Sequence, residues 1–273
     1  MITLNNSDIN LSLKSNKDKI KFKIKDITVG EDLLLCGGPC AIKNEEELHL
    51  IARDVKKAKC NVLRGGAYKP RTSPYSFQGL GKEGINILSK VAKEFDLLSV
   101  SEITNINDID LFANEIDIIQ VGARNMQNFQ LLSELGKIDK PILLKRGFSA
   151  TVTEFLLAAE YILNGGNENV ILCERGIRTF NEYTRNTLDL GTVALIQEIS
   201  NLPIIVDPSH ALGIDLLVPK LSKASIALGV DGLIIECHTN PSVALSDAEQ
   251  TISTEDLVPL VSDLIELRNF LQK

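Results

Sequence analysis

The chain has 273 residues, of which 44% are hydrophobic and 24% charged, with 18 Gly, 9 Pro and 5 Cys. These proportions are typical of a globular protein and exclude a disordered, collagen-like or coiled-coil chain. The formal net charge of −7 disfavours nucleic acid and anionic lipid as partners. The sequence has no run of about 18 apolar residues, and we expect no secretory leader because MITLNNSDINLSLK lacks a basic start followed by an apolar run. We therefore expect a cytoplasmic protein with mostly reduced cysteines and no membrane partner.

The first 30 residues have the period-2 pattern of a half-exposed strand. The run KIKFKIKDITV alternates Lys with apolar residues. Leu11–Leu13 is its expected hairpin partner, across the turn SNKD. We interpret residues 1–30 as an N-terminal extension that forms a β-hairpin.

From residue 31 onward, apolar runs of strand length alternate with longer amphipathic segments. Runs such as PILLK and GLIIE are almost continuously hydrophobic, which is typical of parallel strands buried on both faces. The segments between them, such as EEELHLIARDVKKA, predict helices, and a last helix is expected at Glu255–Leu271. The predicted strands are Leu33–Cys40, Asn61–Tyr68, Leu97–Ile103, Asp117–Ala123, Pro141–Gly147, Val170–Gly176, Pro203–His210 and Gly232–His238.

This order of elements predicts the α/β class. Eight strand-then-helix units in a domain of this length indicate one closed (β/α)8 TIM barrel over residues 31–273. A doubly wound open sheet is the alternative, but its G-x-G-x-x-G fingerprint does not follow the first strand. We expect the N-terminal hairpin to plug the barrel floor, because elements at that end usually serve stability.

A chemically active side chain lies at or just after the end of every predicted strand. Reacting groups in barrels sit at the C-terminal ends of the strands and in the loops that follow. Because all eight strands contribute one, we interpret this end as a functional site. In chain order the residues are Cys40, Arg64 with Lys69 and Arg71, Glu102, Arg124, Lys145, Arg175, His210 and Glu236.

Six of these side chains are cationic. Their convergence inside an acidic chain calls for anions, and Arg is suited to bidentate binding of phosphate and carboxylate. Two phosphates and a carboxylate would match the number of cations. The alternative is that each cation pairs with a neighbouring Asp or Glu in a structural network. The six are Arg64, Lys69, Arg71, Arg124, Lys145 and Arg175.

A second group combines Cys40, His210 and Glu236 with Asp247, which lies in the loop after the last strand. A thiolate, an imidazole and two carboxylates form a ligand set for a divalent transition metal. Taken singly, each residue has a structural alternative: a buried Cys is common, and DPSH could be a turn with a hydrogen-bonded His.

The run RGGAYKPRTSPYSFQGLG, at residues 64–81, resembles the substrate loop of the 3-deoxy-D-arabino-heptulosonate 7-phosphate (DAHP) synthases. KPRTS is its most specific block. The remaining blocks are shared with the 3-deoxy-manno-octulosonate 8-phosphate synthases, and their arrangement resembles the small-barrel subgroup closest to those enzymes. They are GGPCAI (37–42), SEI (101–103), VGARNMQNF (121–129), LLKRG (143–147), ILCERG (171–176), DPSHALG (207–213) and IECHTNPSVALSD (235–247).

This resemblance implies an aldol-like condensation of phosphoenolpyruvate with erythrose 4-phosphate, which gives DAHP and phosphate. The reaction is the first step of the shikimate pathway to the aromatic amino acids. The resemblance also implies a divalent metal of the Mn, Fe, Co or Zn class and a homo-oligomer, a dimer or a tetramer.

The resemblance assigns a role to each matched position. Lys69 is the expected proton donor to the aldehyde oxygen, with a purely electrostatic role as the alternative, and Glu102 is expected to orient water or a cation. Arg71 and Thr72 would hold the phosphate of the sugar. The implied phosphoenolpyruvate ligands are Arg64, Lys69, Arg124, Lys145 and Arg175, and the implied metal ligands are Cys40, His210, Glu236 and Asp247.

Two other functions remain open at this stage. An octulosonate synthase would use arabinose 5-phosphate, but its loop typically reads K-A-N-R-[ST]-S. Here the loop reads Lys69-Pro70-Arg71-Thr72-Ser73, with no Asn. A non-catalytic barrel that serves as a partner module is the other alternative, and the intact set of metal and cation positions argues against it.

Overall fold

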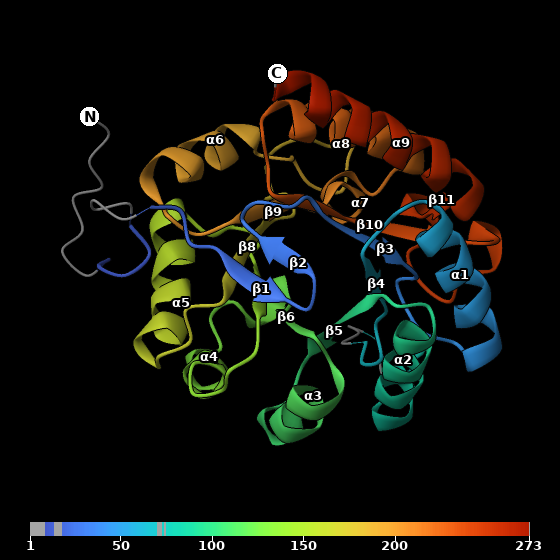
Figure 1. The fold of residues 1–273 in the computed structure, drawn as a ribbon, viewed down its shortest axis with the longest axis horizontal. Coiled ribbons are helices and arrows are strands. Elements are labelled where there is room, and N and C mark those ends of the chain that lie inside the picture. The colour runs from blue at the N-terminus through green and yellow to red at the C-terminus, as the bar shows by residue number, and fades with distance from the viewer. Residues whose placement is uncertain (1–8, 14–17, 70–72, 74, 273) are drawn as a thin grey trace.

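The computed structural model describes residues 9–13, 18–69, 73 and 75–272. Among these residues, eight parallel strands form the predicted closed barrel (Figure 1). Each strand pairs with its neighbour in sequence, and the last one, β10, pairs with both β9 and β3, which closes the ring. An open sheet is thereby excluded. The barrel strands are β3 (Leu34–Gly38), β4 (Val62–Arg64), β5 (Leu98–Ile103), β6 (Ile118–Val121), β7 (Ile142–Lys145), β8 (Val170–Glu174), β9 (Ile204–Val206) and β10 (Gly232–His238).

Helices surround the strands (Figure 1). Local sequence fixes several of their ends: α5 begins with a capping box between Thr151 and Glu154, and Asn44 caps α1 by accepting from the Glu47 amide. The helices are α1 (Glu45–Lys57), α2 (Lys82–Glu94), α3 (Ile109–Glu115), α4 (Phe129–Leu135), α5 (Val152–Asn164), α6 (Leu190–Ile199), α7 (Pro208–Leu212), α8 (Val218–Ala227) and α9 (Thr254–Leu271).

Short elements complete the described chain. A two-residue strand, β11 (Ile252–Ser253), pairs with the end of β10. The single-turn 3-10 helices are η1 (Ile106–Asp108), η2 (Ala123–Asn125), η3 (Asp215–Leu217), η4 (Pro241–Val243) and η5 (Ala248–Gln250).

Six of the eight barrel strands end earlier than predicted, whereas β5 and β10 end at the predicted residues Ile103 and His238. The segment predicted as a strand to His210 stops at Val206, because Asp207 caps a new helix by accepting from the His210 amide and Pro208 occupies its first position. At the end of β3, Gly38 has φ 147°, and a Cβ there would lie 2.1 Å from the Arg64 carbonyl oxygen. His210 therefore lies on α7, and Cys40 lies in the loop after β3.

The N-terminal hairpin is shorter and more local than predicted. β1 (Phe22–Ile24) pairs antiparallel with β2 (Ile27–Val29) around a tight turn in which Lys25 has φ 52°. The prediction that Leu11–Leu13 would be the partner strand was wrong, because Leu13 instead bridges Ser200 beside the barrel. The local turn makes a distant partner unnecessary.

The hairpin covers the amino-terminal end of the barrel (Figure 1). Ile24 and Val29 are buried in the cluster that fills the barrel interior, with first residues of strands such as Leu34, Leu98 and Ile118. This packing agrees with a plug at the barrel floor. A larger cluster fills the layer between strands and helices. All five cysteines are buried and free.

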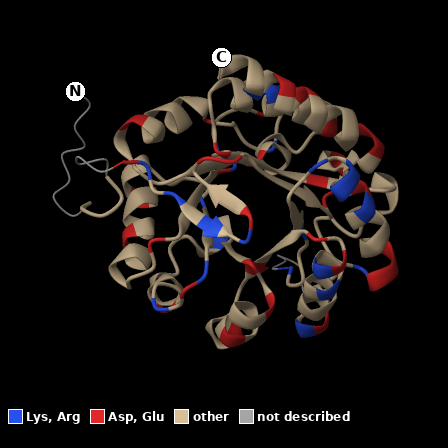
Figure 2. Ribbon diagram, viewed as in Figure 1, with Lys and Arg blue, Asp and Glu red and all other residues tan. Residues whose placement is uncertain are grey.

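The helices of the described residues include none long and apolar enough to cross a membrane. Figure 2 shows that charged residues of both signs lie on the outer helices.

Candidate active site

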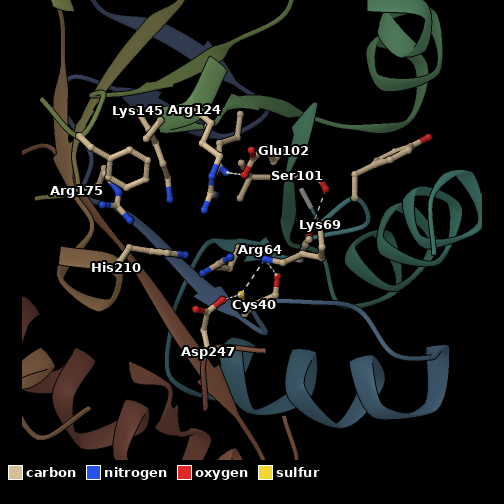
Figure 3. A pocket seen from close by; sticks show the side chains of 18 of the residues that line it. Cys40, Arg64, Lys69, Ser101, Glu102, Arg124, Lys145, Arg175, His210 and Asp247 are labelled. Atoms are coloured by element: carbon tan, nitrogen blue, oxygen red, sulfur yellow. Dashed lines mark hydrogen bonds between the residues drawn. The ribbon is translucent and has the colours of Figure 1, made fainter. Parts of the chain in front are cut away.

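A pocket of about 330 Å³ opens at the carboxyl ends of the strands. Glu236 is buried and contacts two residues that line the pocket, Arg64 and His210. Arg71 and Thr72 lie outside the described residues. All other residues predicted for the site line the pocket: Cys40, Arg64, Lys69, Glu102, Arg124, Lys145, Arg175, His210 and Asp247 (Figure 3).

One side of the pocket holds the predicted metal ligands. Each of Cys40, His210, Glu236 and Asp247 offers one ligand atom, and these atoms all lie within 4.8 Å of one another. Cys40 Sγ is 2.9 Å from Asp247 Oδ2, and His210 Nε2 is 3.2 Å from Glu236 Oε1. Four segments far apart in sequence thus bring sulfur, nitrogen and oxygen donors together, as the sequence predicted.

The chemistry of this cluster fits a divalent cation. His210 Nδ1 is 2.7 Å from Asp207 Oδ2, so the opposite ring nitrogen faces the cluster, and burial lowers the pKa of His210, which favours the neutral ligand form. Burial opposes ionisation of Glu236, yet His210, Arg64 and Lys69 hold its pKa well below its usual range. Burial raises the pKa of the Cys40 thiol to about 12, and a bound cation would favour its thiolate.

Lys69 stands between the metal-ligand cluster and the cations. Its Nζ lies 2.9 Å from Cys40 Sγ and 3.2 Å from the Cys40 carbonyl oxygen. Gly66 packs against the Cys40 backbone, and a Cβ at this position would lie 2.4 Å from the same carbonyl oxygen. The backbone after β4 therefore lies against the Cys40 loop, which places the ammonium of Lys69 at the border.

Two of the predicted cations pair with buried carboxylates. Arg64 Nη1 is 2.7 Å from Glu236 Oε1, and Lys145 Nζ is 2.5 Å from Asp207 Oδ2. The alternative that the cations pair with neighbouring carboxylates therefore holds for Arg64 and Lys145, although both also line the pocket. Asp207 itself links Lys145 to His210 and so joins the cationic and metal-ligand sides of the site.

Arg124 and Arg175 are held differently. Neither pairs with a carboxylate among the described residues, and both guanidinium groups lie over the ring of Phe148, 5.7 and 4.6 Å from its centroid. Burial lowers the pKa of Arg175. Arg175 is 4% exposed, so its charge is buried, and no carboxylate of the described residues pairs with it. A bound anion would compensate it.

Glu102 lies on the opposite side of the pocket from Asp247 (Figure 3). It accepts from Gln120 Nε2 at 3.2 Å and is packed so closely against Gly122 that a Cβ there would come within 2.0 Å of Glu102 Oε1. The predicted role in orienting water or a cation stays a prediction.

Sequence reasoning missed four residues of the site. Asp207 was visible as the first residue of DPSH and follows a strand end, which is the signal that could have identified it. The other three lie in loops or, for Gln250, at the end of η5, and have no periodic or motif signal of their own. They are Phe148, Arg185 and Gln250.

The model of the DAHP synthetase I family matches residues 9–273. A phospho-2-dehydro-3-deoxyheptonate aldolase from Thermotoga maritima is 49% identical over 247 residues, which cover 90% of this chain and 73% of that protein. The chain belongs to the DAHP synthetase I family. It is therefore an enzyme, a transferase of the 3-deoxy-7-phosphoheptulonate synthase type, as the resemblance predicted.

Solved structures agree with this family assignment. A crystal structure of the T. maritima DAHP synthase has a TM-score of 0.90 at 47% identity and covers 93% of this chain and 75% of that one. A truncated form of the T. maritima enzyme has a TM-score of 0.91 at 43% identity, with 97% and 98% covered. A 2-dehydro-3-deoxyphosphooctonate aldolase from Geobacter sulfurreducens is 31% identical over 263 residues, which cover 88% of this chain and 95% of that protein.

Proposed function

We propose that the chain condenses phosphoenolpyruvate with erythrose 4-phosphate to give DAHP and phosphate, with a divalent metal of the Mn, Fe, Co or Zn class. The observation that carries this proposal is the position of the four-residue ligand cluster beside a cationic pocket. Two anionic substrates must meet there, and cations screen their repulsion. The KPRTS loop and the 49% identity to the T. maritima enzyme favour erythrose 4-phosphate.

In this proposal the cations hold phosphoenolpyruvate. Arg124 and Arg175 supply guanidinium donors that no carboxylate uses among the described residues, and Arg64, Lys69 and Lys145 add positive charge. Arg71 and Thr72 would bind the phosphate of the sugar. In this proposal C3 of phosphoenolpyruvate would face the aldehyde carbon between the cations and the cluster.

Cys40, His210, Glu236 and Asp247 would hold the metal, which supplies Lewis-acid polarisation of a carbonyl oxygen when bound. C3 forms a bond to the aldehyde carbon, and Lys69 delivers a proton to the aldehyde oxygen from its position beside Cys40. Water, oriented by Glu102, adds at C2. The C2–O bond to phosphate then breaks, and its electron pair leaves with inorganic phosphate. The added water loses both of its protons as C2 becomes a ketone carbonyl: one restores the Lys69 ammonium and the other protonates the leaving phosphate.

Metal removal tests the first part of the proposal. Chelation should abolish turnover and added Mn²⁺ should restore it. Cys40→Ala should lose both bound metal and activity, whereas Cys60→Ala, at another buried cysteine outside the pocket, should keep both. Full activity of the wild type at a confirmed metal content near zero would contradict metal dependence.

Sugar choice tests the second part. Erythrose 4-phosphate should exceed arabinose 5-phosphate in kcat/KM by at least about tenfold, or about 1.4 kcal/mol of transition-state binding. Equal or reversed preference would assign the chain to the octulosonate reaction. No turnover of either sugar, in protein shown to contain metal, would contradict the proposed substrates.

Three further properties are proposed on the resemblance and the composition. They are a homo-oligomer, either a dimer or a tetramer, a cytoplasmic location, and a division into an N-terminal extension at residues 1–30 and a catalytic barrel at residues 31–273. Light scattering of the purified protein measures the first directly.

A further inference from the structure

Asp247 adopts a backbone conformation that is unusual for its residue type. Its φ and ψ are 55° and 36°, in the left-handed region that residues with a Cβ seldom occupy. The Thr251 hydroxyl donates to the Asp247 carbonyl oxygen at 2.8 Å, and the backbone N–H of Gln250 donates to the same oxygen at 3.3 Å. The surrounding contacts thus hold a strained residue whose carboxylate points into the ligand cluster.

Arg185 contacts that carboxylate from the side away from Cys40. Its Nη1 lies 3.0 Å from Asp247 Oδ1, while Cys40 Sγ lies 2.9 Å from Oδ2. The two oxygens are therefore held by different groups, which fixes the rotation of the carboxylate. The Arg185 side chain is 38% exposed at the pocket wall, so solvent screens this ion pair. The pair therefore orients the carboxylate more than it stabilises the fold.

The same guanidinium nitrogen reaches a second carboxylate through Gln250. Arg185 Nη1 donates to Gln250 Oε1 at 2.7 Å, and Gln250 Nε2 donates to Glu236 Oε2. Gln250 is 2% exposed, and its amide group lies between a cation and an anion with matched donor and acceptor. The orientation of Glu236 thus depends on that of Gln250, which in turn depends on Arg185.

The backbone around Arg185 is attached to the element that carries His210. The Arg185 amide donates to the Leu212 carbonyl oxygen at 2.8 Å, and Asn186 Nδ2 donates to the His210 carbonyl oxygen at 3.1 Å. One short segment after β8 therefore contacts the supports of three ligands: α7, the Asp247 turn and, through Gln250, β10.

We propose that Arg185 and Gln250 are positioning residues that hold Asp247 and Glu236 in the geometry a divalent cation requires. This inference rests on the metal site of the proposed function. Two carboxylates in one cluster repel each other, and the contacts of Arg185 and Gln250 offset that repulsion. They also direct one oxygen of Asp247 toward Cys40 and one oxygen of Glu236 toward His210. Groups that orient metal ligands typically change metal affinity 10–100-fold when removed.

The test measures Co²⁺ and Mn²⁺ affinity by competition with a chromophoric chelator, independently of turnover. The wild type should bind one ion, and Arg185→Ala and Gln250→Ala should each bind about 10–100-fold more weakly. Because Arg185 acts on Glu236 through Gln250, the double variant should lose less than the two single losses combined. Arg185→Lys should recover part of the affinity, because the cation remains but the planar fork is lost.

Two controls separate positioning from general damage. Arg53→Ala removes an exposed arginine whose Nε lies 3.2 Å from Asp54, outside the pocket, and should bind metal as the wild type does. Thermal unfolding in chelator should be similar for the wild type and Arg185→Ala, and the ligand-field spectrum at saturating Co²⁺ should change in Arg185→Ala.

The outcomes distinguish this inference from the proposed function. Wild-type affinity in both Arg185→Ala and Gln250→Ala would overturn the positioning role and leave the metal site intact. A wild type that binds neither ion would overturn the metal site of the proposed function, and with it the positioning role of Arg185 and Gln250. A loss of affinity only in proportion to a loss of folded protein would likewise overturn the positioning role.

Discussion

Two kinds of support hold the cationic side chains of the pocket. Arg64 and Lys145 pair with Glu236 and Asp207, and these pairs occupy part of their donor capacity. Arg124 and Arg175 instead lie over the face of Phe148. A ring face attracts a guanidinium but takes up none of its N–H donors. Apart from a 3.5 Å contact of Arg175 Nη1 with the Gly176 carbonyl oxygen, these two arginines thus keep their in-plane donors, among the described residues, for bidentate contact with an anion.

Replacing the ring should therefore weaken substrate binding more than chemistry. We expect Phe148→Leu to raise the KM for phosphoenolpyruvate about 3–10-fold with a small change in kcat, since cation–π contacts contribute about 0.5–2 kcal/mol. Phe148→Tyr should stay near the wild type. Phe129→Leu is the matched control, because Phe129 stacks on Tyr161 at the surface, outside the pocket. An unchanged KM in Phe148→Leu would show that the ring does not organise the arginines.

Residues at strand ends could be predicted from sequence, whereas those that support them could not. The carboxyl ends of parallel strands converge in a barrel, so locating the strands was enough to bring Cys40, Lys145 and Glu236 into one site. Arg185 and Phe148 lie in loops, and what they contact depends on how loops from different units fold over one another. No period or spacing in one sequence encodes that contact.

At the scale of elements, hydrophobic runs located every barrel strand, but the carboxyl end was correct only for β5 and β10. The residues after β9 remain buried although the chain has already turned into α7, so burial alone extended the predicted strand to His210. For the N-terminal hairpin, the strand was predicted but its partner strand was not. Its alternation was recognised, but the two-residue turn at Lys25 was not, since Lys-Asp is not a typical turn pair for such a hairpin.

The contact between α1 and α2 predicts a pH-dependent contribution to stability. Hydrogen bonding to Glu94 raises the pKa of His49 above its ordinary value of 6.5. A group whose pKa is higher in the folded state stabilises the fold fully below its unfolded pKa, and that contribution is lost as pH rises through the folded pKa. Both side chains are partly exposed, so the contribution is at most about 1 kcal/mol.

We therefore expect the free energy of unfolding, relative to that of His49→Gln, to fall by up to about 1 kcal/mol between pH 6 and pH 9. Urea unfolding at each pH measures it. Glu94→Gln should remove the same pH dependence, because it removes the carboxylate that raises the pKa of His49. A difference that is constant across this range would contradict the role assigned to the pair.

On the scale of the whole molecule, stability and chemistry lie at opposite ends of the barrel. The hairpin inserts Ile24 and Val29 among the first residues of the strands, and the pocket is built from residues toward the carboxyl ends of the strands and from the loops that follow. The chain is acidic overall, with a net charge of −7, yet six cations were predicted to converge at the pocket end. The five of them in the described residues all line the pocket, so cations gather at this end of the barrel although the chain as a whole is acidic.

This separation predicts that a core change at the hairpin lowers stability without changing the chemistry. Ile24→Ala should lower the free energy of unfolding by about 2–4 kcal/mol, because Ile24 is 7% exposed and its loss leaves a cavity among strand residues. The kcat/KM of the folded variant should stay within about twofold of the wild type. Lys23→Ala, exposed on the same strand, should change stability by less than about 0.5 kcal/mol. If Ile24→Ala instead lost activity at unchanged stability, the hairpin would act on the site through the barrel interior, and the two ends would not be independent.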